Sequence, residues 1–438
     1  MVLTEIINDF FSYLKVVFNL IKLFILRWWW IFLPFLLFKY LKFYYLWYIQ
    51  DRWYEKNVNP ILLEIKIPEN IEKPIKAMEQ VIENFWTIYD PPNAKEKWFE
   101  GKFLVSFSME IVAIDGKVHF FIRVPKRMRE IFESAIYSQY PEVEIFEVID
   151  YTKAVPQNIP NRNWDIWGCD ITLLNKTFYP IKTYEMFFEP SPELKEEKVI
   201  DPLSVLVEGM SRLNKGEQMW FQIRAKPFAN EIDWVKEAQN KINEIAGRAK
   251  KEIEDKRTIL GEASRALIYG KVPFEPLLKK EEEPLIPALK LLQTEQEIIK
   301  LITKKIEKHG FETNIRFVYV GKRNVFTKTR IRLMINFLSG LSLPGLNGLK
   351  VTNTTKVTPP ALFRQIKLYS KQRAIFRRYV RRYTPFYPDS GGTYVLNAEE
   401  LATLFHFPSE ISTPSISLER ITARKISPPP FLPLEEEF

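Results

Sequence analysis

The sequence FLVSFSMEIVAIDGKVHFFIRV, residues 103–124, decides the first part of the fold. Two segments rich in β-branched and aromatic residues flank the pair Asp115–Gly116. Such segments are typical of β-strands. An Asp–Gly pair between two of them is a strong signal for a two-residue turn. The stretch therefore predicts a β-hairpin.

The segments on both sides of this hairpin complete a first unit. Residues 61–67 alternate apolar and polar side chains as a strand does, and residues 73–86 repeat apolar side chains at helical spacing. A second helix is predicted at 126–139 and a fourth strand at 143–148. The order strand–helix–strand–strand–helix–strand is that of a ferredoxin-like sandwich, which we assign to residues 57–150.

A second, interrupted version of this order follows a Pro- and Asn-rich connector at residues 151–183. Further strands are predicted at 183–189, 219–226 and 313–320, and further helices from Asp201, Ile232, Glu295 and Thr327. We assign residues 184–358 to a second ferredoxin-like unit, opened by a helical insertion at about 230–310. The insertion is read either as a solvated pair of helices or as a protruding hairpin that contacts a partner.

The N-terminus predicts an amphipathic and transmembrane helical anchor over residues 1–56. Residues 4–28 repeat apolar side chains at intervals of three and four, as an amphipathic helix does. Residues 28–48 then provide about 20 mostly apolar residues, the length that crosses a bilayer. Aromatic residues near both ends are the predicted membrane-interface residues: Trp28, Trp29, Trp30, Tyr44, Tyr45, Trp47 and Tyr48.

The alternative for this segment is a helix that lies in the plane of the membrane. Cations follow the apolar stretch at Lys39, Lys42, Arg52 and Lys56. By the positive-inside rule they place the remaining domains on the cytoplasmic side of a bacterial inner membrane. The predicted fold class is thus α+β, with an N-terminal membrane helix, two ferredoxin-like units, a long helical insertion in the second, and an extended C-terminal tail.

Composition and motifs exclude several kinds of catalytic and metal site. One cysteine, Cys169, excludes an internal disulfide framework and a multi-cysteine zinc or iron–sulfur site. The sequence has no phosphate-binding P-loop and no GxGxxG, GxSxG or HExxH motif. We therefore predict a protein that is not an enzyme and that binds no cofactor or metal. Its formal net charge of +9 predicts an anionic partner.

The most polarised segment is a predicted basic helix at residues 359–385, and its central sequence contains no acidic residue. The candidate anion-binding residues are Arg364, Lys367, Lys371, Arg373, Arg377, Arg378, Arg381 and Arg382. An apolar stripe is expected to face the protein, formed by Phe363, Ile366, Phe376, Val380 and Tyr383. The cations would then face a nucleic-acid backbone, an anionic lipid surface, an acidic protein surface, or solvent alone.

The C-terminal residues 386–438 predict a connector and a Pro-rich tail. The stretch EELATLFHFP is expected to form a short helix that stops at Pro408. His406 is expected to pack or cap this turn and not to act as a catalyst. The predicted partner-docking residues are Leu401, Leu404, Phe405, His406, Phe407 and Pro408.

Five stretches together carry a resemblance to a known family. They are residues 118–151, 178–189, 201–227, 314–326 and 391–409, among them FIRVP, IYSQYPEVEI and LNAEELATLFHFP. In this order they resemble the membrane-anchored, non-ATPase region of type IV secretion and conjugation ATPases of the HerA/FtsK superfamily. They also resemble stand-alone proteins of this type from candidate-phyla (Patescibacteria-like) bacteria. The likeness extends over residues 61–433.

In full-length family members, the segment that resembles residues 399–433 leads into the ATPase domain. Here no P-loop follows, so the resemblance implies a separate P-loop ATPase chain and transfers no catalytic residue. We expect a non-enzymatic, membrane-anchored platform subunit of a type IV secretion-like or conjugative DNA translocation system. DNA backbone and a second copy of the chain are further expected partners. The alternative is a cell-envelope structural protein that binds an anionic membrane surface and has no nucleic-acid role.

Overall fold

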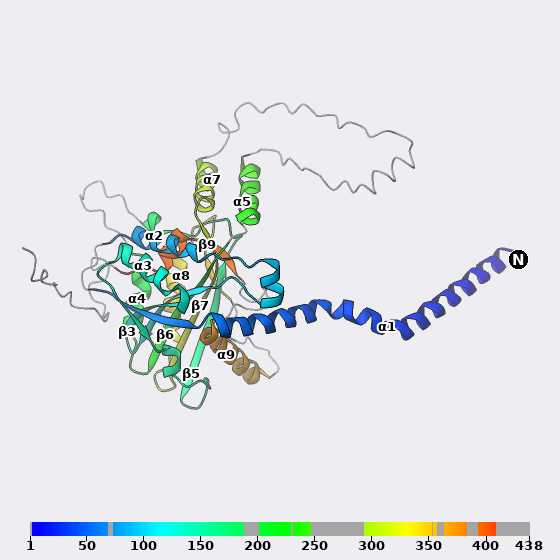
Figure 1. The fold of residues 1–438 in the computed structure, drawn as a ribbon, viewed down its shortest axis with the longest axis horizontal. Helices are drawn as coiled ribbons and strands as arrows, with labels where there is room; N and C mark the ends of the chain where they lie inside the picture. Colours follow the sequence, from blue (N-terminus) through cyan, green and yellow to red (C-terminus); the bar gives the residue numbers. More distant parts are fainter. Residues whose placement is uncertain are drawn as a thin grey trace, which may run out of the picture. The chain divides into compact units, whose positions relative to one another are not determined.

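The computed structural model (Figure 1) describes residues 2–68, 73–187, 201–228, 231–246, 293–352, 354–356, 363–382 and 393–408. The chain divides into two compact units. The first consists of residues 1–59 and 90–105, and the second of residues 60–89 and 106–438.

In the first unit, α1 (Val2–Asn57) is a single long helix, against which residues 90–105 fold back. Tyr45 donates a hydrogen bond from its hydroxyl to the carbonyl oxygen of Trp98, at 2.9 Å. The ammonium of Lys42 lies 4.9 Å from the centre of the Trp98 ring. Phe103 packs against the rings of Trp53 and Tyr54.

Across the described residues, no helix is long and apolar enough to cross a membrane. The prediction of a transmembrane helix is therefore wrong, although the helix itself is present. The described side chains of α1 include cations among the apolar residues, at Lys15, Lys22, Arg27 and Lys42. Each cation in an apolar span adds to the free energy of burying that span in lipid.

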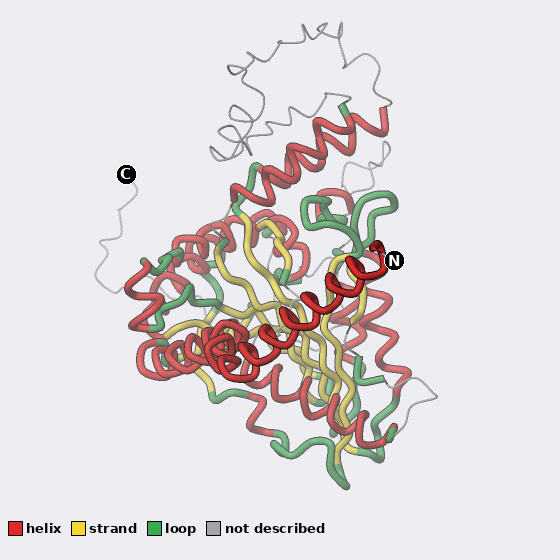
Figure 2. The backbone as a smooth tube through the Cα atoms, turned by 90° about the vertical axis from the view of Figure 1, so that its right-hand side faces the viewer, coloured by secondary structure: helices red, strands yellow, loops and turns green. Residues whose placement is uncertain are grey.

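The second unit is built on one nine-stranded sheet, which Figure 2 shows in yellow. The strand order is β4-β1-β3-β2-β6-β7-β5-β8, and β9 pairs with β7 beside that path. The strands are β1 (Pro60–Lys66), β2 (Phe107–Ile114), β3 (Lys117–Pro125), β4 (Glu144–Val148), β5 (Trp164–Leu173), β6 (Glu217–Pro227), β7 (Gly310–Lys322), β8 (Leu349–Thr352) and β9 (Tyr394–Asn397).

The predicted hairpin is confirmed as β2 and β3, which pair antiparallel around Asp115 and Gly116. Both turn residues adopt positive φ angles, 53° and 86°, as this turn type requires. However, β2 also pairs with β6 over eight residue pairs, from Phe107–Ala225 to Ile114–Gln218. This pairing joins both halves into one sheet, so the prediction of two ferredoxin-like units is wrong. The α+β class holds.

Helices cover both faces of this sheet, because alternate residues of each strand point to opposite sides. Met109 and Ile111 of β2 face the larger core, whereas Val112 faces a second core. The larger core packs beneath α2 (Ile75–Phe85), α3 (Arg129–Gln139), α4 (Ser204–Ser211), α8 (Ile331–Gly340) and α10 (Ala398–Leu404). The second core packs beneath α9 (Arg364–Arg381).

Two other predicted segments differ in the structure. The predicted connector at 151–183 contains the ten-residue strand β5, because its aromatic and β-branched residues after Asn163 pair with β7. The predicted strand at 183–189 is instead a 3₁₀ turn, Tyr184–Phe187, in the part that is described. Of the predicted insertion, α5 (Glu231–Ile245) and α7 (Gln293–Ile306) are described and lie side by side (Figure 1). Residues 247–292 lie outside the described part of the chain.

The described part of the predicted C-terminal connector, residues 393–408, belongs to the core. Strand β9 pairs with β7, and Asn397 then caps α10 by accepting a hydrogen bond from the backbone N–H of Glu400. The Glu400 side chain bonds back to the Asn397 backbone, which completes a capping box. The predicted Pro-rich tail, residues 409–438, lies outside the described residues.

Substitution of Phe221 tests whether the sheet unfolds as one unit. Phe221 on β6 is fully buried and pairs with Ile111 of β2. The centre of its ring lies 5.9 Å from the centre of the Phe337 ring. We expect Phe221→Ala to lower the free energy of unfolding by about 3–5 kcal/mol. Hydrogen exchange of the sheet amides in urea, followed by mass spectrometry, should show β1–β4 and β5–β8 losing protection in one step, at lower urea than in the natural protein. Loss of protection in two separate steps would contradict a single sheet, and Val205→Ala on the exposed side of α4 is the control.

Candidate functional site

The basic helix α9 has two halves with different surroundings. In its first two turns almost every side chain is exposed. In its later turns Gln372, Ile375, Phe376 and Tyr379 are buried against the second core. Gly168 of β5 permits this close approach, because a Cβ atom there would lie 3.0 Å from the Ile375 side chain.

A row of polar residues crosses the sheet beneath α9. Glu110 of β2 pairs with Gln222 of β6, which pairs with Arg316 of β7, which pairs with Asp170 of β5. All four side chains are buried. Since an unpaired buried charge is very unfavourable, this row requires partners from the layer above.

Arg382, at the end of α9, supplies the first partner. Its Nε lies 2.7 Å from Oε1 of Glu110, and its Nη2 lies 2.9 Å from Oε2. Its Nη1 lies 2.6 Å from Oδ2 of Asp150. Tyr151 donates a hydrogen bond to Glu110 at 2.7 Å, and the hydroxyl of Tyr379 lies 2.8 Å from that of Tyr151.

The ionic form of this cluster follows from its geometry. Burial alone would raise the pKa of Glu110, but the Arg382 guanidinium holds that pKa below its usual value. Asp150 is less deeply buried than Glu110. Burial raises its pKa as well, but the Arg382 guanidinium again holds that pKa below its usual value. Both carboxylates therefore remain charged beside a charged guanidinium.

Arg378, one turn earlier on α9, supplies the second partner. Its Nη1 lies 2.9 Å from Oδ2 of Asp170, whose Oδ1 lies 2.7 Å from Nε of Arg316. Arg316 also donates from Nη1 to the Arg378 carbonyl oxygen at 3.1 Å. Three carboxylates and three guanidinium groups thus meet between α9 and the sheet: Glu110, Asp150, Asp170, Arg316, Arg378 and Arg382.

The eight candidate cations of α9 therefore serve two purposes. Arg378 and Arg382 make internal ion pairs, so the expectation that they face an external anion is wrong. Arg373 is partly buried and donates to the Gln157 carbonyl oxygen at 3.0 Å. Five cations of α9 have exposed side chains: Arg364, Lys367, Lys371, Arg377 and Arg381.

The predicted apolar stripe of α9 is also wrong in its first half. Phe363 and Ile366 are 66% and 67% exposed, and Tyr369 beside them is also exposed. Phe376 is buried as predicted, and Val380 is partly buried. Neither Phe363 nor Ile366 belongs to a hydrophobic core cluster of the described residues. Tyr383 lies outside the described residues.

The predicted docking residues are buried. Leu401, Leu404, Phe405, His406, Phe407 and Pro408 all lie within the protein and offer no exposed surface. The ring of His406 has acceptors at both nitrogens: the Ala402 carbonyl oxygen at 2.8 Å and Oδ1 of Asp201 at 2.9 Å. Burial alone would lower the pKa of His406, but Asp201 raises it above its usual value, so the imidazolium is favoured.

Of the predicted membrane-interface residues, Tyr44, Tyr45, Trp47 and Tyr48 are exposed on α1. The side chains of Trp28, Trp29 and Trp30 lie outside the described part of the structure.

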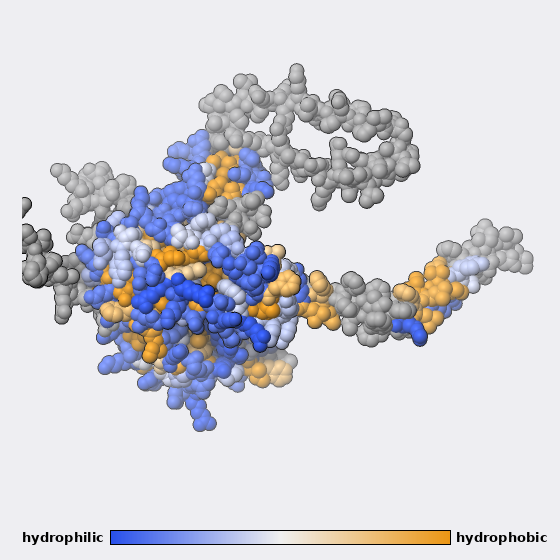
Figure 3. Space-filling model, viewed as in Figure 1, coloured by the Kyte–Doolittle hydropathy of each residue, from blue (hydrophilic) through white to orange (hydrophobic). Residues whose placement is uncertain are grey.

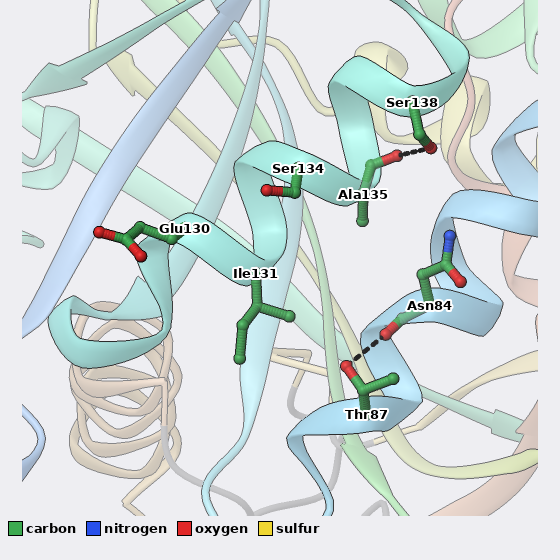
Figure 4. A pocket seen from close by; sticks show the side chains of 7 residues that line it. All are labelled: Asn84, Thr87, Glu130, Ile131, Ser134, Ala135 and Ser138. Carbon is green, nitrogen blue, oxygen red and sulfur yellow. Dashed lines mark hydrogen bonds between the residues drawn. The ribbon is translucent and has the colours of Figure 1, made fainter.

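The surface also has a hollow of about 490 Å³ between α2 and α3 (Figure 4). Two of its polar side chains bond to nearby backbone. Thr87, in the 3₁₀ turn that follows α2, donates to the Asn84 carbonyl oxygen, and Ser138 donates to that of Ala135 within α3, each at 2.8 Å. Polar groups do not converge there as they do in an active site. Within the described residues, no group of three or more His, Cys, Asp or Glu side chains could hold a metal ion.

Sequence reasoning missed the buried charges of the sheet. Glu110 and Arg316 occupy positions where an alternating strand usually exposes polar residues. A signal was present, because both strands have apolar residues at the neighbouring positions of the same face, Val112 and Val318. That pattern indicates a covered face on which the charges need internal partners.

A removal of one arginine tests the internal pairing. We expect Arg382→Met to lower the free energy of unfolding by about 3–5 kcal/mol, because Glu110 would remain buried and charged. Adding Glu110→Gln should recover a large part of that loss. Arg377→Met, at an exposed position of the same helix, should change it by less than about 0.5 kcal/mol. Equal effects of Arg382→Met and Arg377→Met in urea unfolding would contradict the pairing.

The imidazolium of His406 predicts a pH dependence. Because its pKa is raised in the folded state above the value of 6.5, its stabilising effect is complete below pH 6.5. That effect is lost as pH rises through the folded pKa. Urea midpoints measured between about pH 6 and pH 9 should therefore fall more steeply for the natural protein than for His406→Gln. Parallel curves would show that the pair with Asp201 carries no charge.

Comparison with known proteins identifies a family. The sequence profile of DUF8128, described as a domain of unknown function, matches residues 93–418, which is most of the chain. The matched range includes the polar row of the sheet, α9 and α10. No curated protein matches the sequence.

Proposed function

The chain belongs to the DUF8128 family, and we propose that it is a non-enzymatic subunit of a type IV secretion-like DNA translocation apparatus. In this role it is a platform that holds the phosphate backbone of DNA on α9. A separate P-loop ATPase chain hydrolyses ATP to drive translocation. The observation that carries the proposal is that α9 has five exposed cations and contains no acidic residue.

The attachment of α9 to the sheet supports a binding role for its exposed cations. Arg378 and Arg382 hold its C-terminal turns to the sheet through buried ion pairs. The exposed cations are therefore carried on a helix of fixed orientation, and less side-chain ordering is needed when an anion binds. An 18-residue helix is about 27 Å long, enough to contact several phosphates.

The chemistry of these residues suits phosphate. Arg364 and Arg377 each offer a planar fork that donates two parallel hydrogen bonds to a phosphate. Lys367 and Lys371 add point charges between them. Contacts of this kind are independent of base sequence and strongly dependent on salt.

The ATPase partner rests on the resemblance to type IV secretion and conjugation ATPases. Residues 401–408 are buried, so the contact with that partner must lie elsewhere on the chain. The apolar residues exposed beside the cations on α9, Phe363, Ile366 and Tyr369, support a protein contact at this end of the helix.

Charge reversal on α9 tests DNA binding. We expect the full chain to bind duplex DNA of mixed sequence at about 50 mM salt, with affinity that falls as salt rises. The variant Arg364→Glu, Lys367→Glu, Arg377→Glu should lower the affinity at least about tenfold. It should also reduce the slope of log affinity against log salt by about three, since each phosphate contact contributes about 0.9. Fluorescence anisotropy with a labelled duplex measures both.

The matched control has the same change in charge elsewhere on the second unit. Arg127→Glu, Lys215→Glu, Arg332→Glu also replaces two arginines and one lysine at exposed positions. It should retain most of the affinity and the slope. An equal loss in both variants would show binding through net charge alone. No binding by the natural protein would favour the alternative class, a cell-envelope structural protein without a nucleic-acid role.

A further inference from the structure

The helix α1 exposes far more apolar surface than a helix in water usually does. In the described part between Tyr13 and Tyr48, large apolar side chains are exposed along its length, and Figure 3 shows apolar residues in orange there. Leu14, Val17 and Ile21 are 48%, 51% and 52% exposed. Their spacing of three and four residues places them on one face of the helix.

The same segment has a polar stripe on its other side. Ser12, Lys15, Asn19 and Lys22 recur at intervals of three and four, and all are exposed. A helix with one apolar face and one cationic face is suited to lie in the plane of a lipid surface. There the apolar face enters the acyl region and the cations remain among the headgroups.

Charge identifies the kind of surface. From Ser12 to Gln50 the sequence contains no acidic residue, whereas it contains Lys15, Lys22, Arg27, Lys39 and Lys42. Such a segment is attracted more strongly to an anionic surface than to a zwitterionic one.

Aromatic residues continue the apolar surface further along α1. Tyr44, Tyr45, Trp47 and Tyr48 are all exposed, and Tyr45 keeps its hydroxyl bonded to Trp98 within the same unit. Tyrosine and tryptophan have an apolar ring and a polar group, which suits them to the boundary between headgroups and acyl chains.

We propose that α1 is an in-plane docking helix for an anionic phospholipid surface. Its apolar stripe around Leu14, Val17 and Ile21 enters the outer part of the bilayer, and its cations contact lipid phosphates. This proposal is independent of DNA binding by α9, which lies in the other unit.

Vesicle flotation of the full chain tests this proposal. The natural protein should float with vesicles containing anionic phosphatidylglycerol, and at least about tenfold less with pure phosphatidylcholine. Lys15→Glu, Lys22→Glu, Arg27→Glu should lower partition to the anionic vesicles at least about tenfold, because each cation near the surface contributes about a factor of five. Leu14→Ser, Val17→Ser, Ile21→Ser should abolish flotation on both kinds of vesicle.

Two control variants distinguish lipid binding by α1 from an effect of net charge and from binding through α9. Lys126→Glu, Lys215→Glu, Arg332→Glu makes the same charge change on exposed residues of the second unit and should float normally. The α9 variant Arg364→Glu, Lys367→Glu, Arg377→Glu should also float normally, even where DNA binding is lost. Equal flotation of the natural protein with both lipids would overturn the proposal. A second result would also overturn it. The natural protein would sediment without lipid as a dimer that does not bind vesicles, and the Leu14, Val17 and Ile21 variant would sediment as a monomer.

Discussion

The buried carboxylates of the sheet are the constraint on which the second unit depends. Glu110, Gln222, Arg316 and Asp170 lie side by side across four adjacent strands, on the face opposite the larger core. This row crosses the β2–β6 boundary, where the two halves of the sheet meet. The row itself has two carboxylates and one guanidinium group, so it is incomplete without partners. Asp150, Arg378 and Arg382 complete a balanced set, and breaking one such buried pair commonly costs several kcal/mol.

This constraint gives α9 its orientation and so relates the fold to the proposed function. The helix must direct Arg378 and Arg382 inward, and its periodicity then turns Arg377 and Arg381 away from the sheet. The internal arginines neutralise the sheet, while Arg364 and Arg377 are exposed and lie outside these ion pairs. Binding of a phosphate backbone and attachment of the helix thus use different residues of one short sequence.

Local chemistry in the sequence predicted the elements better than their assembly. The β2–β3 hairpin follows from Asp115–Gly116, and α9 follows from its own composition. The pairing of β2 with β6 joins residues more than one hundred positions apart, and no local pattern specifies that register. Arg381 and Arg382 are neighbours in sequence, yet one is exposed and the other buried, because Glu110 and Asp150 are brought together only by the fold. His406 was predicted to pack, whereas its partner Asp201 could not be predicted from sequence.

Modification of arginines with phenylglyoxal, followed by mass spectrometry, tests the division of α9 most directly. In the full chain, Arg364 and Arg377 should react quickly, whereas Arg316 and Arg382 should remain unmodified until the protein unfolds. Duplex DNA at low salt should then protect Arg364 and Arg377, and leave exposed Arg127 of the same unit reactive. Modification of Arg382 as fast as Arg364, or no protection of Arg364 and Arg377 by DNA, would contradict the account.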